Sequence, residues 1–185
     1  MNFKNNCSFT GHRADKLSWK DETSKQAENF KMQLCIEIAH KIKAGCNTFY
    51  TGMCNGVDII AGEMILELKE TFPHIKLIAV IPYEDFASSW SEEWRERYFD
   101  LLAKVDDEIL LNHKYKPNCF KQRNEYLVKH AGHLIAVHNN GDYKSGTYQT
   151  INMANRRNRS IVTIEPNSLE TKRIESKSKF TLLNK

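Results

Sequence analysis

Long hydrophobic runs are missing from this 185-residue chain. No stretch approaches the roughly 20 apolar residues that a membrane-spanning helix needs. The first residues, Met1 to Asn6, are polar and lack the apolar core of a secretory signal peptide. These absences argue against a membrane-spanning or secreted protein, and we expect a cytoplasmic location.

Paired cysteines are also missing. The chain has five cysteines, an odd number, and they lie far apart with no paired spacing. Scattered cysteines argue against a disulfide framework and against a zinc site, and they suit a reducing compartment. The five are Cys7, Cys35, Cys46, Cys54 and Cys119.

The common catalytic signatures are absent as well. The sequence has no nucleophile elbow, no zinc-ligand spacing and no phosphate-binding loop with its lysine. It therefore predicts no metal site and no cofactor. A net charge of +4 permits binding of a small anion or weak contact with nucleic acid, and it requires neither.

What the sequence does contain is a glycine-bearing turn between a strand and a helix, from Phe49 to Asp58. Gly52 and Gly56 allow a sharp turn and a close approach by a ligand. After them, apolar residues from Val57 to Phe72 recur at helical spacing. A helix that begins after such a turn points unpaired N–H groups toward it, which favours an anion such as a phosphate. The alternative is an ordinary strand–turn–helix corner without a ligand.

Strand-like and helix-like patterns alternate about six times along the chain. Continuous apolar runs such as Lys76–Ile81 and His133–His138 are typical of parallel strands that are covered on both faces. The pattern predicts an α/β fold with a doubly wound, mostly parallel sheet of about six strands and helices on both faces. We expect one domain over residues 1–166. Residues 167–185 are polar without periodicity, and we expect a flexible C-terminal tail there.

Ligands bind open parallel sheets beyond the carboxyl ends of the strands. The loops that the pattern places at this edge are also the loops richest in glycine and hydrogen-bonding side chains. We therefore expect a ligand site built from these loops, which are Gly11–Arg13, Gly52–Asp58, Pro82–Trp90, His113–Asn118 and Asn139–Thr147.

Besides the central turn, two of these loops are suited to a phosphate-bearing ligand. Gly11, His12 and Arg13 combine a permissive backbone, an imidazole and a fixed cation. Ser145, Gly146 and Thr147, at a predicted helix start, offer a hydroxyl and N–H groups. The loop Gly11–Arg13 could alternatively be an ordinary polar surface loop after a strand. The helix start at Gly146 and Thr147 could alternatively be an ordinary capped helix end without a ligand.

Three further candidates carry charge. Asp58 at its helix start either complements the helix dipole, accepts a hydrogen bond from a sugar hydroxyl, or orders the loop. Arg123 either clamps a phosphate through two hydrogen bonds or is a solvated surface arginine. Glu63 is the best-placed single carboxylate if the protein is an enzyme, and a structural or solvated role is its alternative.

Several of these residues occur in an order and spacing that resemble a known family. The segments that carry the resemblance are Cys7–Arg13, Thr51–Asp58, Cys119 with Arg123 and Asn124, Leu134–Val137, and Gly146 with Thr147. Together they resemble the YpsA-like proteins, a bacterial and phage family (the DUF1273 group) within the SLOG superfamily. The resemblance covers roughly Met1 to Pro166.

The superfamily includes the LOG phosphoribohydrolases, the DNA-processing protein DprA, and sensor domains for NAD- or ADP-ribose-derived signals. The resemblance implies a Rossmann-like sheet with a nucleotide-type ligand at the strand ends. It also implies ligand-binding roles for Gly11, His12, Arg13, Gly52, Gly56, Asp58, Arg123, Asn124, Gly146 and Thr147.

The sequence departs from the LOG enzymes at one instructive place. Those enzymes carry a proline-glycine-glycine-x-glycine-threonine run with a glutamate three positions after the threonine. Here Ser145 replaces one glycine, and Thr150 stands at the position of the glutamate. A carboxylate there would stabilise the charge that develops as a glycosidic bond breaks, so its absence argues against hydrolysis.

We therefore expect a protein that binds a nucleotide or an ADP-ribose- or NAD-derived small molecule, as a sensor or by sequestration. One alternative is a LOG-like nucleotide N-glycosidase in which Glu63 or His12 assists. The other is a DprA-like binder of single-stranded DNA, which would need a basic groove and stacking aromatics. Similar proteins are often dimers, so a homodimer is a further expectation.

Overall fold

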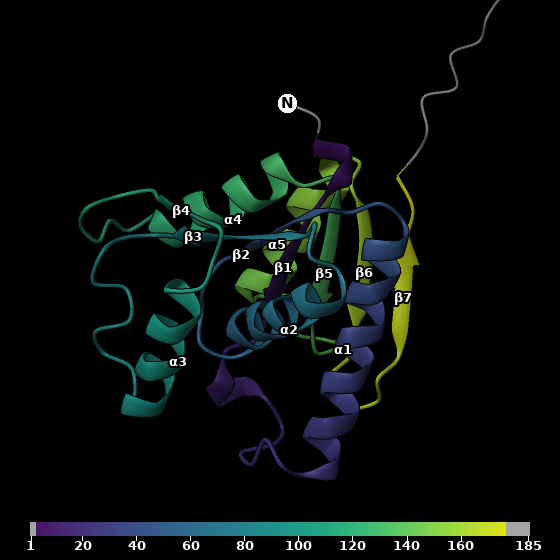
Figure 1. Cartoon of the computed structure of the whole chain (residues 1–185), viewed down its shortest axis with the longest axis horizontal. Coiled ribbons are helices and arrows are strands. Elements are labelled where there is room, and N and C mark those ends of the chain that lie inside the picture. The colour runs from purple at the N-terminus through teal and green to yellow at the C-terminus, as the bar shows by residue number, and fades with distance from the viewer. Residues whose placement is uncertain (1–2, 177–185) are drawn as a thin grey trace, which may run out of the picture.

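The computed structural model describes residues 3–176, and it has one sheet between two layers of helices (Figure 1). The strands are β1 (Asn6–Gly11), β2 (Thr48–Thr51), β3 (Lys76–Ile81), β4 (Asp107–Leu110), β5 (His133–Val137), β6 (Ser160–Ile164) and β7 (Thr171–Ile174). The helices are α1 (Lys25–Lys43), α2 (Val57–Thr71), α3 (Glu92–Leu102), α4 (Cys119–His130) and α5 (Gly146–Arg156). Two short 3-10 helices, η1 (Phe3–Asn5) and η2 (Ala14–Lys16), flank β1.

The strand order is β4-β3-β2-β1-β5-β6-β7, and every neighbouring pair is parallel except β6 and β7. β1 is central, with Cys7 beside Phe49 of β2 on one side and His133 of β5 on the other. The chain runs from β1 out to β4 and then returns to the far side of β1. This reversal opens a crevice beyond the carboxyl ends of β1 and β5. The predicted Rossmann-like, mostly parallel α/β fold is confirmed.

The two faces of the sheet are covered by different helices. On one face Phe9 and Phe49 are fully buried in a cluster that includes residues of α1, α2 and α3. On the other face Leu134 of β5 packs in a cluster with Val128 of α4 and Ala154 of α5. Burial on both faces explains the near-continuous apolar runs of β3 and β5. Replacing a fully buried side chain such as Phe9 by alanine is expected to cost about 3–5 kcal/mol.

Local sequence signals set the ends of the longest helix, α1. The Oγ of Ser24 accepts a hydrogen bond from the N–H of Ala27 at 3.3 Å, which is an N-cap interaction. At the other end Gly45 has a φ of 97°, and the N–H of Cys46 reaches back to the carbonyl of Lys41. This arrangement satisfies carbonyls that the end of a helix would otherwise leave unpaired.

The sheet has one strand more than the sequence pattern predicted. Thr171–Ile174, in the segment expected to be a tail, form β7 and pair antiparallel with β6. The strand is mostly exposed, so it lacks the apolar pattern that would reveal it in the sequence. Arg173 holds it to α1 through an ion pair with the buried carboxylate of Glu37. Residues 177–185, the rest of the expected tail, lie outside the described residues.

None of the helices in the part of the chain that the structure describes is long and apolar enough to cross a membrane.

Candidate functional site

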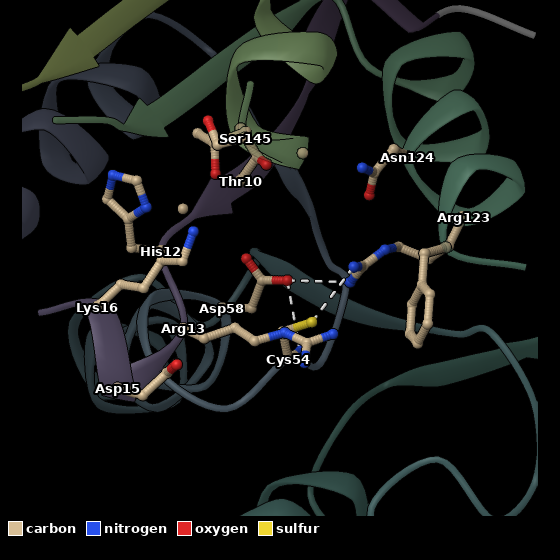
Figure 2. Close-up of a pocket in the computed structure, with 14 residues that line it drawn as sticks. Thr10, His12, Arg13, Asp15, Lys16, Cys54, Asp58, Arg123, Asn124 and Ser145 are labelled. Carbon is tan, nitrogen blue, oxygen red and sulfur yellow. Dashed lines mark hydrogen bonds and ion pairs between the residues drawn. The ribbon is translucent and has the colours of Figure 1, made fainter. Parts of the chain in front are cut away.

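A pocket of about 390 Å³ lies in the crevice where the strand order reverses (Figure 2). Its walls come from the end of β1 and the loop after it, the turn before α2, the first half of α4, and the start of α5. Four segments that are far apart in the sequence therefore meet at one place. The pocket lies where Rossmann-like folds bind their ligands.

Eight of the ten residues that the sequence analysis proposed for ligand binding line this pocket. They are Gly11, His12, Arg13, Asp58, Arg123, Asn124, Gly146 and Thr147. Gly52 and Gly56 do not line it.

Six further residues line the pocket but were not among the proposed ligand-binding residues. Helical spacing could have found Phe120, since it precedes Arg123 and Asn124 by three and four positions and so lies on the same face of α4. Lys16 was hidden in a polar segment without periodicity, which the structure folds into η2. The six are Thr10, Asp15, Lys16, Cys54, Phe120 and Ser145.

The floor of the pocket holds a buried ion pair. Arg123 Nη1 lies 3.1 Å from Asp58 Oδ2, and both side chains are almost completely buried. Arg123 also donates to the carbonyl of Gly52, and its Nη2 lies 3.3 Å from Cys54 Sγ. The N–H of Cys54 donates to the same Asp58 oxygen at 3.4 Å. These contacts join α4 to the turn that precedes α2, and they direct the Arg123 guanidinium at protein groups.

Burial and neighbouring groups shift the pKa values of Asp58 and Arg123 to different net effect. Burial raises the pKa of the Asp58 carboxyl above its ordinary value, and it outweighs the lowering by Arg123, the Cys54 N–H and Arg13. Burial also acts to lower the pKa of the Arg123 guanidinium, but Cys54 and Asp58 raise that pKa by more. Arg123 therefore keeps its charge, whereas the partners of Asp58 do not fully offset the cost of burying its charged form.

Gly52 and Gly56 leave room for other parts of the chain to pack closely against the turn before α2. A Cβ on Gly52 would lie 1.8 Å from Arg123 Nη1, so only glycine leaves room for the guanidinium. Gly56 has a φ of 99°, and a Cβ there would lie 2.6 Å from the carbonyl oxygen of His12 and from the backbone nitrogen of Ala14. The two glycines therefore let neighbouring segments pack against the turn.

The expected anion cradle in this turn has several of its N–H groups already bonded to protein. The N–H of Met53 donates to Thr51 Oγ1 at 3.2 Å, and the N–H of Cys54 donates to Asp58. The N–H of Val57, the first residue of α2, donates to the carbonyl of His12 at 3.2 Å. These groups stabilise the turn, so the start of α5 is the better candidate for an anion.

The start of α5 is open toward the pocket. Ser145 is its N-cap, and Ser145 Oγ accepts from the N–H of Tyr148 at 3.1 Å. A Cβ on Gly146 would meet nothing within 4 Å, so a ligand can approach the backbone there. The first N–H groups of a helix have no partner within it, and those of Gly146 and Thr147 lie at the pocket wall. This end of α5 can bind an anion.

His12 holds two loops together. Its Nε2 accepts a hydrogen bond from the backbone N–H of Asn139 at 2.8 Å, so the neutral ring carries its proton on Nδ1. Burial lowers the pKa of the His12 ring, and the nearby His138, whose ring centroid lies 5.9 Å away, lowers it further. His12 is therefore a neutral imidazole that fixes the loop between β5 and α5.

Two cations lie at the wall of the pocket. The guanidinium of Arg13 lies 5.5 Å from the centroid of the Phe120 ring, a cation–π contact that orients it. Lys16 is half-exposed, and its Nζ lies 3.8 Å from a carboxylate oxygen of Asp142. With the start of α5, these side chains give the pocket a positively charged side.

Glu63, the carboxylate proposed for catalysis, lies outside the pocket. On α2 it forms two hydrogen bonds with Arg97 of α3, at 2.8 Å and 2.7 Å. Thr150, at the position of the LOG glutamate, is fully buried and donates to the carbonyl of Gly146 at 2.8 Å. The carboxylates that do line the pocket are Asp15 and Asp58. Among residues 3–176, no group of three His, Cys, Asp or Glu side chains is arranged to hold a metal ion.

The fold of this chain is similar to that of a protein of known structure. It is DNA processing protein A from Helicobacter pylori, described for its single-stranded DNA binding mode. The TM-score is 0.56 with 20% sequence identity, over 86% of this chain. The chain spans 65% of the length of that protein. At this identity the similarity establishes a shared fold.

The chain is also similar in sequence to a set of UPF0398 proteins from bacteria. It is 28% identical to a UPF0398 protein of Halalkalibacterium halodurans over 168 residues, which is 88% of each chain. It is 26% identical to one of Ligilactobacillus salivarius, over 70% of this chain and 72% of the other. With the Bacillus subtilis protein YpsA it shares 29% identity over 45% of this chain and 47% of that one. A model of the YspA SLOG family matches residues 7–169, and the chain therefore belongs to that family.

Proposed function

We propose that this protein binds a nucleotide or an ADP-ribose- or NAD-derived molecule in the pocket at the strand reversal, as a sensor or a sequestering protein. One observation carries the proposal. The open N-terminus of α5 and the cations Arg13 and Lys16 line the same pocket. A helix N-terminus with flanking cations is a site for a phosphate group.

The size and lining of the pocket support a ligand larger than a phosphate ion. Its volume of about 390 Å³ lies within the range of small-molecule sites, roughly 300–1,000 Å³. Phosphate would bind at Gly146 and Thr147 with Arg13 and Lys16. The remaining space, toward Asp58 and Asn124, is polar and can hold a sugar.

Binding of single-stranded DNA is the second candidate, because the neighbour of similar fold is described for that activity. Such binding would use the same phosphate contacts and would extend along a basic groove. Several phosphate contacts would make the affinity fall steeply with salt, whereas a mononucleotide makes few. Strand length and salt dependence therefore separate the two candidates.

The N-glycosidase alternative has less support from the geometry. Glu63 points to Arg97 and lies outside the pocket, and Thr150 supplies no carboxylate. If the protein is an enzyme, the candidate acids and bases that line the pocket are His12, Asp15, Lys16, Cys54 and Asp58. Glu63→Gln should then leave both binding and any product formation unchanged.

The proposal is tested by thermal-shift titration with AMP, ADP, NAD, ADP-ribose and a thymidine oligonucleotide, with each ligand recovered for mass analysis. A ligand at 100 times its dissociation constant adds about 2.7 kcal/mol of stability, a clear rise in melting temperature. We expect a shift with a nucleotide that is recovered intact. A shift that grows with oligonucleotide length and vanishes at high salt would favour DNA. No shift with any ligand would contradict the proposal.

A variant localises the binding to the pocket. Arg13→Gln removes one charge from the phosphate end, and loss of a hydrogen bond to a charged group costs about 1.5–3 kcal/mol. We therefore expect at least a tenfold weaker affinity. Arg95→Gln is the matched control, since Arg95 is exposed on α3 and lies outside the pocket. If Arg13→Gln and Arg95→Gln bind the ligand with equal affinity, the ligand binds outside this pocket.

A further inference from the structure

Two buried polar atoms of residues that line the pocket have no hydrogen-bond partner, Asp58 Oδ1 and Arg123 Nε. Asp58 is only 4% exposed, and its Oδ2 takes both of its hydrogen bonds, from Arg123 and from the N–H of Cys54. Its Oδ1 is buried without any hydrogen-bond partner. Figure 2 shows Oδ1 directed away from Arg123, toward the side of the pocket where Thr10 and Ser145 lie. A buried carboxylate oxygen left in this state is costly, because water no longer solvates it.

The chemistry of this atom restricts what can lie against it. An ionised carboxylate only accepts hydrogen bonds, so its partner in a ligand must be an N–H or O–H group. A phosphate oxygen is excluded from this position, because two negative charges would face each other. The pocket therefore offers two kinds of contact. The N-terminus of α5 and the two cations suit an anion, and Asp58 Oδ1 suits a hydrogen-bond donor.

We propose that Asp58 Oδ1 accepts a hydrogen bond from a ribose hydroxyl, so that the pocket selects ribonucleotides over deoxyribonucleotides. This inference rests on the proposed nucleotide binding. In a nucleotide the hydroxyl donors lie on the same sugar that carries the phosphate, so one ligand can present both groups to one pocket. In dinucleotide-binding Rossmann folds, at another position of the fold, an aspartate or glutamate accepts a hydrogen bond from the ribose 2′-hydroxyl. Asn124, from the facing helix α4, lines the same space with an amide that can both donate and accept.

The proposal also distinguishes nucleotide binding from single-stranded DNA binding. DNA has no 2′-hydroxyl, and within a DNA strand the 3′-oxygen is esterified and cannot donate. A strand of DNA would therefore leave Oδ1 without a partner. Selection for ribose favours a free ribonucleotide or an ADP-ribose-type molecule as the natural ligand.

The test compares ligands that differ by one hydroxyl. The four ribonucleoside 5′-monophosphates and their 2′-deoxy and 3′-deoxy counterparts are titrated calorimetrically into the wild-type protein. We expect at least one deoxy series to bind at least tenfold more weakly than its ribonucleotide. Equal affinities of the ribo and both deoxy ligands would overturn the inference and leave nucleotide binding standing. Absence of binding by all ligands would overturn the proposed function and the inference together.

A variant assigns the selectivity to Asp58. In Asp58→Asn the amide oxygen is expected to face Arg123 and the Cys54 N–H, which are both donors, so the NH₂ group faces the pocket. The ratio of ribo to deoxy affinity should then fall at least about threefold, because a neutral amide forms a hydrogen bond with the hydroxyl that is only about half as strong as that of a carboxylate. A ratio that stays at the wild-type value would overturn the assignment to Asp58. Asp100→Asn on the exposed side of α3 is the matched control, with the ratio of the wild type.

The inference remains testable if Asp58→Asn does not fold, because the comparison of ligands needs only the wild-type protein. A purine riboside 5′-monophosphate, which lacks the exocyclic amine of AMP, supplies the remaining control. If deletion of this amine weakens binding by tenfold while deletion of either hydroxyl does not, the donor at Asp58 is the base. That outcome would overturn the assignment to ribose.

Discussion

The imidazole of His12 and the backbone of Asn139 are joined by a hydrogen bond of 2.8 Å across the point where the strand order reverses. His12 follows β1, and Asn139 follows β5, the strand that pairs with it. The bond therefore fixes the two loops that meet over the pocket. It requires an unprotonated Nε2, which links the geometry of the site to pH.

We expect acid to weaken the protein through His12. Burial lowers the pKa of this ring in the folded state, so the unfolded chain binds the proton more readily. The stabilising contribution is then complete above the ordinary histidine pKa of 6.5 and is lost as pH falls from there toward the folded pKa. Denaturant unfolding at several pH values measures this dependence.

The control for this prediction is His12→Gln, whose side-chain oxygen can still accept from Asn139. His133, whose pKa burial also lowers, contributes in the same direction in both proteins. The difference in slope between the wild type and the variant therefore reports His12 alone. Identical slopes would show that the ring does not resist protonation.

Gly56→Ala is expected to destabilise the protein more than Gly45→Ala. Both glycines have a φ near 100°, at 99° and 97°, where an alanine is strained by about 1–3 kcal/mol. Only at Gly56 would the new Cβ also lie 2.6 Å from backbone atoms of Ala14 and His12, whereas nothing lies within 4 Å of a Cβ at Gly45. Overpacking adds about 1–3 kcal/mol. Urea midpoints of the two variants measure the difference.

If the two variants are equally stable, the loop after β1 moves aside without cost, and the close approach at Gly56 is not required. If Gly56→Ala is the weaker one, a bulky residue at Gly56 is unsuitable as a probe of ligand binding. Any loss of binding in such a variant would then include loss of folded structure.

Removing one partner of the Asp58–Arg123 pair is expected to lower the free energy of unfolding strongly. Arg123→Met leaves the Asp58 carboxylate buried without its cation, which costs about 3–5 kcal/mol. The double variant with Asp58→Asn should lose less than the sum of the single changes, because no unpaired charge remains. Free energies of unfolding for the four proteins of this cycle give the coupling.

An exposed ion pair on α4 is the reference with which the coupling energy of the buried pair is compared. Lys121 and Glu125 lie one turn apart on α4, with 4.0 Å between Nζ and Oε1, and both are exposed. Their coupling should be within about 0.5 kcal/mol. A coupling at Asp58 and Arg123 as small as this one would mean that water reaches the buried pair.

Residues close in the sequence determined the type and order of most elements. Alternating apolar runs and helical periodicity depend on neighbours within a few positions, so they predicted the parallel sheet and placed eight of the proposed residues at its carboxyl edge. The edge strand β7 escaped prediction because its side chains are mostly exposed and follow no burial pattern.

The tertiary structure alone decided how the site is held together. Asp58 and Arg123 are 65 positions apart, and nothing in the local pattern of either indicates that α4 brings the guanidinium to the turn before α2. For the same reason the sequence assigned Gly52 and Gly56 to the ligand, whereas the structure uses their missing side chains to admit Arg123 and the loop after β1. The sequence likewise put Glu63 forward for catalysis, and packing of α2 against α3 directs it to Arg97. Local propensity selects elements, but which polar groups meet depends on how those elements pack, and packing is a property of the whole chain.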